Sequence, residues 1–379
     1  FYITRIWDLE EVEDLFAIPS CVILATKVAS GSRESACSIP ALFWNSLKQE
    51  RFREGNIALA SLGKKTAWIE EDPEIPTARS YGYYTSQFRQ GADLMPRKAL
   101  FVELRRANPD QEVVAIQTSQ IEMDNPYQKK FKGQRFRGRV SRRYLFTTLT
   151  SKQIVPFAVC GDYLPTVVLP VEMQGNRFVV LSRQEMIDRG DIGVAAWFQE
   201  VDSHGDIGDK KMRQRIDERG KLTQQEYGPG DILVHYGASG KIPCAAIQRV
   251  NPDIEHPFVA DQTTYVYRAD SEDEAYYLLG MLNATILGDL IRAFQSKGGF
   301  GARHLHNLPA DAIPQYDRED SRHQDLIGLS RMAEARARED LVDEMCNPSN
   351  RLGQRRTWVR GAIADHLDLL NDIVKEILT

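Results

Sequence analysis

The segment KKFKGQRFRGRVSRR, residues 129–143, is the part of the sequence best suited to binding a polyanion. It contains eight Lys or Arg residues and no Asp or Glu. Cations at this density can neutralise phosphates and release counterions, and arginine can also read guanine edges. A run of charges can equally be a solvated surface loop, and that alternative stays open. We predict a nucleic-acid contact through this basic stripe, whose cations are Lys129, Lys130, Lys132, Arg135, Arg137, Arg139, Arg142 and Arg143.

A second candidate set follows a helix-like segment that ends near residue 295. Lys297, Arg303, His304 and His306 lie among glycines that make the backbone flexible. We rank these four residues below the stripe as DNA contacts, because a stop signal after a helix would explain the glycines equally well. His304 and His306 have no third ligand nearby, so the sequence does not predict a metal site.

No catalytic motif is complete in this sequence. Asp124-Asn125-Pro126-Tyr127 is close to the Asn-Pro-Pro-Tyr type of tetrapeptide that holds a flipped base in DNA amino-methyltransferases. The second proline is missing and no glycine-rich cofactor loop precedes the tetrapeptide, so we interpret it as a turn. The residues therefore predict neither a catalytic site nor a cofactor in this chain.

The charge of the chain is divided between the basic stripe and an acidic remainder. The 379 residues contain 48 Lys or Arg and 53 Asp or Glu, which gives a net charge of −5. Because eight of those cations lie in the stripe, the rest of the chain carries a balance of −13. A local basic patch, rather than the net charge, is the electrostatic signature of a nucleic-acid-binding surface.

The composition is that of a globular chain with more than one domain. Hydrophobic residues make up 42% of it. No apolar run approaches the length of about 18 residues that a membrane helix needs, so we expect no membrane partner. The five cysteines are scattered without a CxxC pair, which predicts reduced thiols and a cytoplasmic location. The sequence begins with Phe1 rather than Met, and we expect it to be a piece of a longer protein.

The elements that must position these residues are mainly strands before residue 270 and helices after it. The patterns predict a buried strand at 21–27, a half-buried strand at 113–121, and a hairpin of two strands, 231–235 and 244–250. One long helix is predicted over 271–294, because a capping-box pattern opens it and leucine or isoleucine recurs every four residues.

The tail, residues 321–379, contains two amphipathic stripes separated by the helix-breaking turn Asn347-Pro348-Ser349-Asn350. Two long stripes joined by a short loop predict an antiparallel helical hairpin. Such stripes usually form core, so we expect the hairpin to pack or to dock a partner rather than to do chemistry.

Several segments resemble the C-terminal half of adenine-specific DNA methyltransferases of restriction-modification type, in particular their target-recognition region. A further segment is similar to the one that closes the catalytic domain of that family. Together they extend over the chain in the family's order. The segments are FRQGADLMPR (88–97) with 101–103, YYLLGMLNA (276–284) with 294–296, GARHLHNLP (301–309) with 313–317, and LFAIPSCVIL (15–24) for the catalytic-domain end.

The resemblance implies an α+β fold in which a mixed-sheet DNA target-recognition domain is followed by the C-terminal antiparallel helical hairpin. It divides the chain into 1–35, the tail end of a methyltransferase catalytic domain; 36–320, the target-recognition region; and 321–379, the hairpin. The family transfers a methyl group from S-adenosylmethionine to the amino group of adenine. Its cofactor loop and catalytic tetrapeptide precede the target-recognition region, and this sequence has neither of them.

We therefore expect a chain that recognises double-stranded DNA for a parent protein that binds S-adenosylmethionine. The expected partner, besides DNA, is a catalytic methyltransferase domain or subunit. The alternative is a non-catalytic specificity or scaffold subunit that docks a separate catalytic chain through its C-terminal hairpin.

Overall fold

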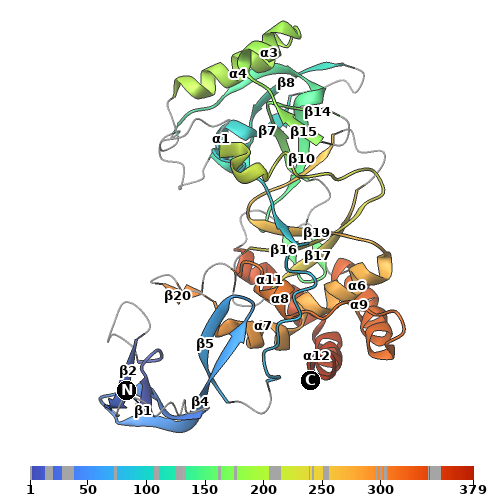
Figure 1. Cartoon of the computed structure of the whole chain (residues 1–379). Coiled ribbons are helices and arrows are strands. Elements are labelled where there is room, and N and C mark those ends of the chain that lie inside the picture. Colours follow the sequence, from blue (N-terminus) through green and yellow to red (C-terminus); the bar gives the residue numbers. More distant parts are fainter. Residues whose placement is uncertain are drawn as a thin grey trace.

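From top to bottom, Figure 1 shows an upper lobe, a helical lobe and an N-terminal sheet. This computed structural model confirms the α+β class, with mixed sheets and a helical C-terminus. It describes residues 2–12, 20–27, 38–71, 75–105, 111–123, 131, 133–160, 164–174, 177–204, 215–238, 240, 243–250, 256–295, 297–298, 301–302, 305–339, 341 and 351–379.

The N-terminal sheet has the strand order β2-β1-β3-β4-β5. β1 is antiparallel to β2 and parallel to β3, and β3, β4 and β5 are antiparallel neighbours. The predicted boundary at residue 35 falls between strands of this one sheet, and the boundary stays a prediction. The strands are β1 (Tyr2–Asp8), β2 (Cys21–Thr26), β3 (Ser38–Ser46), β4 (Arg51–Leu62) and β5 (Lys65–Glu70).

β2 is a strand as predicted, but the prediction that it is buried is wrong. All six of its residues are exposed, and Ile23 retains 55% of its accessible surface. β2 lies at the edge of the sheet, whereas the small core of this sheet consists of Ile6, Ile39, Ala41 and Ile57 from β1, β3 and β4. The apolar run therefore predicted the strand but not which strands carry the core.

The upper lobe is built on a six-stranded sheet with the order β18-β10-β13-β7-β8-β9. β10 is parallel to β18, and the other neighbours are antiparallel. The predicted strand 113–121 ends at Thr118, after which α2 begins. The elements are α1 (Arg97–Leu100), β7 (Phe101–Leu104), β8 (Val113–Thr118), α2 (Gln120–Met123), β9 (Arg137–Ser141), β10 (Leu145–Leu149), β13 (Thr166–Val168), β14 (Val171–Gln174), β15 (Arg177–Val180), α3 (Arg183–Asp188), α4 (Ile192–Ser203) and β18 (Phe258–Ala260), with short 3-10 helices at Arg142–Tyr144 and Glu218–Gly220.

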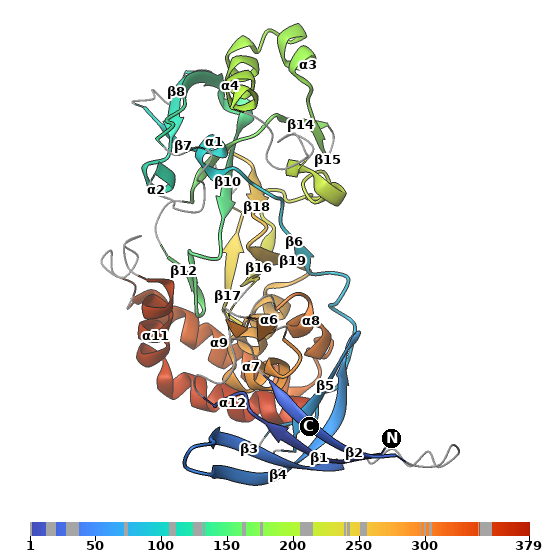
Figure 2. The ribbon, with the colours of Figure 1, turned by 90° about the vertical axis from the view of Figure 1, so that its left-hand side faces the viewer.

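A four-stranded antiparallel sheet, β17-β16-β19-β6, lies between the upper lobe and the helices, as Figure 2 shows. The predicted hairpin of 231–235 with 244–250 is confirmed as β16 paired with β17. A two-stranded hairpin, β11–β12, packs beside β17. The bounds are β6 (Arg89–Gln90), β11 (Ile154–Val155), β12 (Ala158–Val159), β16 (Ile232–Gly237), β17 (Ala245–Arg249) and β19 (Thr264–Ala269).

An ion pair between Arg97 and Asp261 joins the upper lobe to this connecting sheet. Arg97 Nη2 lies 2.9 Å from Asp261 Oδ1, and both side chains are buried. Next to this ion pair, the backbone N–H of Ala92 donates to Ala260 O, and that of Gln262 donates to Ala92 O, each at 2.8 Å. A buried ion pair beside backbone hydrogen bonds fixes the two parts relative to each other.

The helical lobe packs its helices around one large core that also includes side chains of the connecting sheet. The predicted helix 271–294 begins where expected, because Ser271 Oγ accepts the N–H of Glu274 at 3.1 Å. It is two helices, however, since the backbone is extended at Ala284 (φ −63°, ψ 133°). The elements are α6 (Glu272–Asn283), α7 (Thr285–Arg292), β20 (Lys297–Gly298), β21 (Gly301–Ala302), α8 (Leu308–Ala312), α9 (Ser321–Glu339), α11 (Leu352–Ala362) and α12 (Ala364–Leu378).

The tail forms the predicted antiparallel arrangement. Arg322, in the first turn of α9, donates Nη1 to Glu376 O, near the end of α12, at 3.0 Å. The second arm is divided at Ile363, which is buried between α11 and α12 and has a non-helical backbone (φ −113°, ψ 20°). The predicted turn at 347–350 lies outside the described residues.

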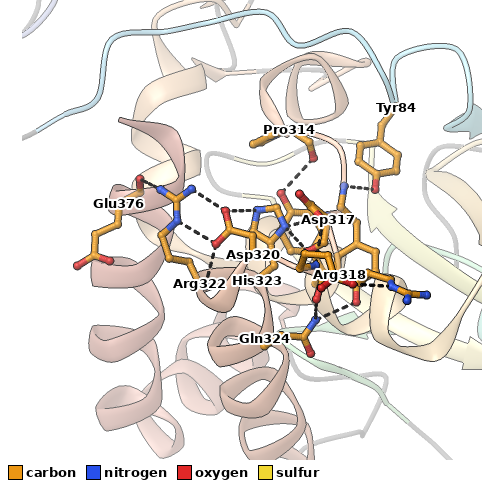
Figure 3. A network of polar contacts seen from close by, with 12 residues as sticks. Tyr84, Pro314, Asp317, Arg318, Asp320, Arg322, His323, Gln324 and Glu376 are labelled. Atoms are coloured by element: carbon orange, nitrogen blue, oxygen red, sulfur yellow. Dashed lines mark hydrogen bonds and ion pairs between the residues drawn. The ribbon is translucent and has the colours of Figure 1, made fainter.

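The polar network in Figure 3 fixes the start of α9. His323 Nδ1 accepts the backbone N–H of Asp317 at 3.0 Å, and its ring centroid lies 4.4 Å from that of Tyr277. Arg322 donates to both oxygens of Asp320, at 3.1 and 2.6 Å. Burial lowers the pKa of His323, and a neutral ring is what an accepting Nδ1 requires. The network therefore holds the helix in place.

Candidate nucleic-acid interface

β9 and the residues just before it carry a row of arginines that points outward. Arg135, Arg137 and Arg139 are exposed, whereas Phe136 and Val140 each retain 1% of their surface. Successive side chains of a strand point to opposite faces, which puts Arg137 and Arg139 of β9 on one face, and Arg135 is exposed two residues before the strand begins. β9 is also the last strand of the six-stranded sheet, so one of its edges pairs with no strand among the described residues. The three residues are called the arginine row below.

α4 supports β9 from the opposite face. Trp197 donates its Nε1–H to Ala99 O at 3.0 Å, and its ring centroid lies 5.9 Å from that of Phe136. A Cβ at Gly138 would lie 3.1 Å from the Trp197 ring, and one at Gly193 would lie only 2.0 Å from a β9 carbonyl oxygen. Helix and strand are therefore in close contact, and the arginines project from a rigid base.

The positive charges of the arginine row are not neutralised by acidic side chains of the described residues. Arg137 and Arg139 have no ion pair or hydrogen bond from their side chains to other described residues. Arg135 donates Nη2 to the amide oxygen of Gln120 at 3.0 Å, which leaves its positive charge uncancelled. Unpaired guanidinium groups on an exposed strand can each bind a phosphate or the edge of a guanine.

Arg142 and Arg143, at the end of the stripe, are used within the fold. Arg142 Nε donates to Gln111 O at 2.7 Å. Arg143 forms an ion pair with Asp191 and covers the ring of Tyr144. Burial, and then the hydrogen bond to Asp191, raise the pKa of Tyr144, so its hydroxyl stays protonated and donates to Asp191 at 2.6 Å. Their role in DNA binding stays a prediction, and the geometry favours the arginine row over them.

The other predicted contacts do not join the arginine row. His306 is exposed in a left-handed backbone conformation (φ 48°), and its carbonyl oxygen accepts the hydroxyl of Tyr236 at 2.6 Å. It is thus bonded to β16 of the connecting sheet, whereas β9 belongs to the six-stranded sheet of the upper lobe. Lys297 is the first residue of β20, and its side chain is not among the parts that the structure describes. The predicted contacts outside the described residues are Lys129, Lys130, Lys132, Arg303 and His304, as is the tetrapeptide 124–127.

Sequence reasoning missed the strand that presents the row. The alternation of arginine with Phe136, Gly138 and Val140 is a period-two pattern and could have predicted β9. It also missed cations of the tail, which was expected only to pack or to dock a partner. Arg355 and Arg356 of α11 lie close to the upper lobe, and only the folded chain shows this.

Neither a metal centre nor a membrane helix is present in the part of the chain that the structure describes. No three His, Cys, Asp or Glu side chains there are grouped so that they could hold a metal ion. No helix there is long and apolar enough to cross a membrane.

Comparisons with known proteins support the fold. No protein-family model matches the sequence, and no curated protein matches it. Among solved structures, the chain is similar to the type IIL restriction-modification enzyme MmeI, determined in complex with DNA, with a TM-score of 0.52 and 9% identity over 99% of this chain and 43% of that chain. The type IIG restriction endonuclease BpuSI is 14% identical over 99% of this chain and 44% of its own, but its TM-score of 0.30 is too low to indicate a shared fold. The chain thus has the fold of a segment of a restriction-modification enzyme and spans less than half of that enzyme's length.

Proposed function

We propose that this chain recognises a double-stranded DNA target for an S-adenosylmethionine-dependent, adenine-specific DNA methyltransferase of restriction-modification type. It would be the part that contacts DNA, and the cofactor and catalytic residues would belong to another domain or subunit. The observation that carries the proposal is the arginine row: three exposed cations, of which two lie on one face of the edge strand β9, which α4 holds rigid, and the third lies just before that strand. The fold shared with MmeI, which was solved with DNA, supports it.

The spacing of the row suits a duplex. Two residues along an antiparallel strand advance about 6.8 Å, which equals the rise of about two base pairs along the DNA axis. Neighbouring arginines can therefore reach different phosphates, while the base edges between them remain open to other loops. Phosphate contacts of this kind position a protein on DNA, and contacts to base edges add the specificity.

A cytoplasmic location agrees with the thiols of the chain. Cys21, Cys160 and Cys244, the cysteines among the described residues, form no disulfide with one another. Scattered, unpaired cysteines are typical of the reducing cytosol. We propose that the protein acts there, where DNA is available to it.

The test of the proposal is duplex binding as a function of salt. The unmodified chain should bind a random-sequence duplex pool at low salt, with an affinity that falls steeply as salt rises. Replacing Arg135, Arg137 and Arg139 by Ala should weaken binding at least tenfold and reduce the slope of log affinity against log salt by about 2 to 3, since each phosphate contact contributes about 0.9.

The matched control removes three exposed arginines elsewhere, Arg177, Arg318 and Arg336, and so makes the same change in net charge. Its affinity should stay within about twofold of the unmodified chain if position matters more than total charge. Equal losses in the two triple variants would show attraction by net charge only. No binding to any duplex at low salt would reject the proposal.

A further inference from the structure

A pocket of about 710 Å³ lies where the upper lobe meets the helical lobe. Its walls come from β7, β13, α2, the segment around the β11–β12 hairpin and α11; Figure 2 shows α2, β12 and α11 on the same side of the molecule. The arginine row does not line this pocket, which is therefore a separate site. Its charged lining residues are Arg97, Glu103, Glu122, Lys152 and Arg355.

Both carboxylates of the pocket already have protein partners. Glu122 lies 3.7 Å from Arg97. Glu103 accepts the backbone N–H of Gln120 at 2.6 Å and the hydroxyl of Ser119 at 3.2 Å. These acidic groups are thus engaged with the upper lobe, and they do not pair with the cations on the opposite wall.

Arg355 is a buried cation that has no partner in the part of the chain that the structure describes. The residue retains 6% of its surface, and its Nε atom is enclosed without a hydrogen bond. Burial of an unpaired charge is strongly unfavourable. A guanidinium in this position can therefore bind an anionic group that enters the pocket.

Two further cations lie next to Arg355. Lys152 is exposed at the wall of the pocket and has no ion pair with another described residue. Arg356 donates Nε to Ile154 O and Nη2 to Ser151 O, each at 3.1 Å, and neutral carbonyl groups leave its positive charge uncancelled. A planar guanidinium backed by additional positive charge is well suited to the oxygens of a phosphate.

The pocket adjoins the arginine row. The strand register places Glu103 opposite Gln117, and Gln117 opposite Arg137, so these three residues share one face of the sheet. Strands are about 4.8 Å apart, which puts the rim of the pocket about 10 Å from Arg137. Arg135 is also bonded to Gln120, the first residue of α2, and the residues that follow it in α2 line the pocket.

We propose that this pocket binds a backbone phosphate of the same duplex that contacts the arginine row, with Arg355 as its main ligand. The choice of DNA as the source of the phosphate rests on the proposed function, because free phosphate offers the same oxygens. A duplex held at the row and at the pocket is fixed in orientation by both lobes, since neither contact alone prevents rotation about it.

The experiment uses the 379-residue chain, a random-sequence duplex pool and a salt titration. Arg355→Met removes the charge at a similar side-chain volume and should lower duplex affinity about tenfold or more, with a salt slope reduced by about 1. Arg355→Lys keeps a positive charge and should retain most of the slope. Arg318→Ala, which removes one exposed arginine far along the chain from the pocket, is the control and should leave both values unchanged.

Lys152→Ala serves as a second test, because this exposed side chain can be removed without disturbing the core; it should also lower the salt slope. Unmodified affinity and slope in a folded Arg355→Met protein, or in Lys152→Ala if Arg355→Met does not fold, would overturn the proposal. Thermal unfolding in inorganic phosphate separates the two sources of phosphate. A rise in Tm that needs Arg355, combined with duplex binding that does not, would show a free-phosphate site and reject DNA as the ligand.

Failure of the proposed function is distinguishable from failure of the pocket. If the unmodified chain binds no duplex, the proposed function is rejected by that result alone. An Arg355-dependent rise in Tm with phosphate then still supports a phosphate site, whereas the same Tm with and without phosphate overturns it.

Discussion

Gly193 is the residue that allows α4 to approach the arginine row closely. A Cβ atom there would lie 2.0 Å from Arg139 O, and because the obstacle is backbone it cannot rotate away. Trp197, four residues along the same helix, then fills the space left by Gly138. At the scale of single residues, two glycines and one tryptophan therefore determine how closely α4 packs against β9.

We expect Gly193→Ala to force α4 and β9 apart. Overpacking of this kind should lower the free energy of unfolding by about 1–3 kcal/mol, measured by urea denaturation, and weaken duplex binding. Gly328→Ala is the matched control, because it makes the same change in α9, where an added Cβ meets nothing within 4 Å. The control should be neutral or slightly stabilising, since alanine favours a helix over glycine. An unchanged Gly193→Ala protein would contradict the close contact.

Asn371 shows how one helix determines where another begins. Its Oδ1 accepts the backbone N–H groups of Thr285, at 2.8 Å, and of Ile286, at 3.2 Å. The first N–H groups of a helix have no partner within it, so a side chain from α12 caps α7. The break at Ala284 is stable because of this contact between distant parts of the sequence.

We expect Asn371→Ala to lower the free energy of unfolding by about 1–2 kcal/mol, because two N–H groups lose their acceptor. Asn371→Asp should restore most of the loss, since it keeps the oxygen and adds a negative charge at a helix N-terminus. Urea denaturation of both variants measures the difference. Equal losses in Ala and Asp would show that the contact is packing rather than capping.

The sequence predicted elements where a local pattern determines them. The cap at Ser271, the hairpin of β16 and β17, and the antiparallel tail all depend on residues close to one another or on simple periodicity. The break at Ala284 was missed because the Asn371 contact is long-range. The burial of β2 was predicted wrongly because the sequence of one strand does not show its place in the sheet. β2 is an edge strand, and the core residues come from other strands.

The candidate site was predicted only in part. The cations of the stripe were identified by their density, but density does not separate the exposed Arg137 from Arg143, whose partner Asp191 lies 48 residues away. Arg355 was missed because the pocket it lines is formed by segments from both lobes. Charge is readable from a sequence, whereas the pairing of charges depends on the whole fold.

At the scale of the whole molecule, the tail is part of the core of this chain. Leu370 is completely buried and Leu367 retains 6% of its surface, among side chains of α6, α7 and α9. The apolar stripe through which a scaffold subunit was expected to dock a catalytic chain is therefore occupied within the molecule. This burial favours DNA recognition over docking through the hairpin.

We expect Leu370→Asp to unfold the helical lobe, because a charge placed in this core has no partner. The adjacent Leu369 is 54% exposed, so Leu369→Asp is a close control and should unfold at the unmodified temperature. Thermal unfolding and solubility distinguish the two variants. A Leu370→Asp protein that stays folded but no longer co-purifies with another chain would favour the scaffold alternative.

The ion pair between Arg97 and Asp261 fixes the upper lobe relative to the connecting sheet when the chain folds, so the proposed contact sites are in place before any duplex is bound. A surface that already has its bound shape loses little freedom on association, and no closing motion delays the encounter. Under the proposed function, diffusion and orientation would govern the rate of duplex binding, and repulsion between DNA and the acidic remainder of the chain would favour approach through the basic edge. Under the proposed function, a preformed surface of this kind would suit a protein that tests many DNA sites in succession.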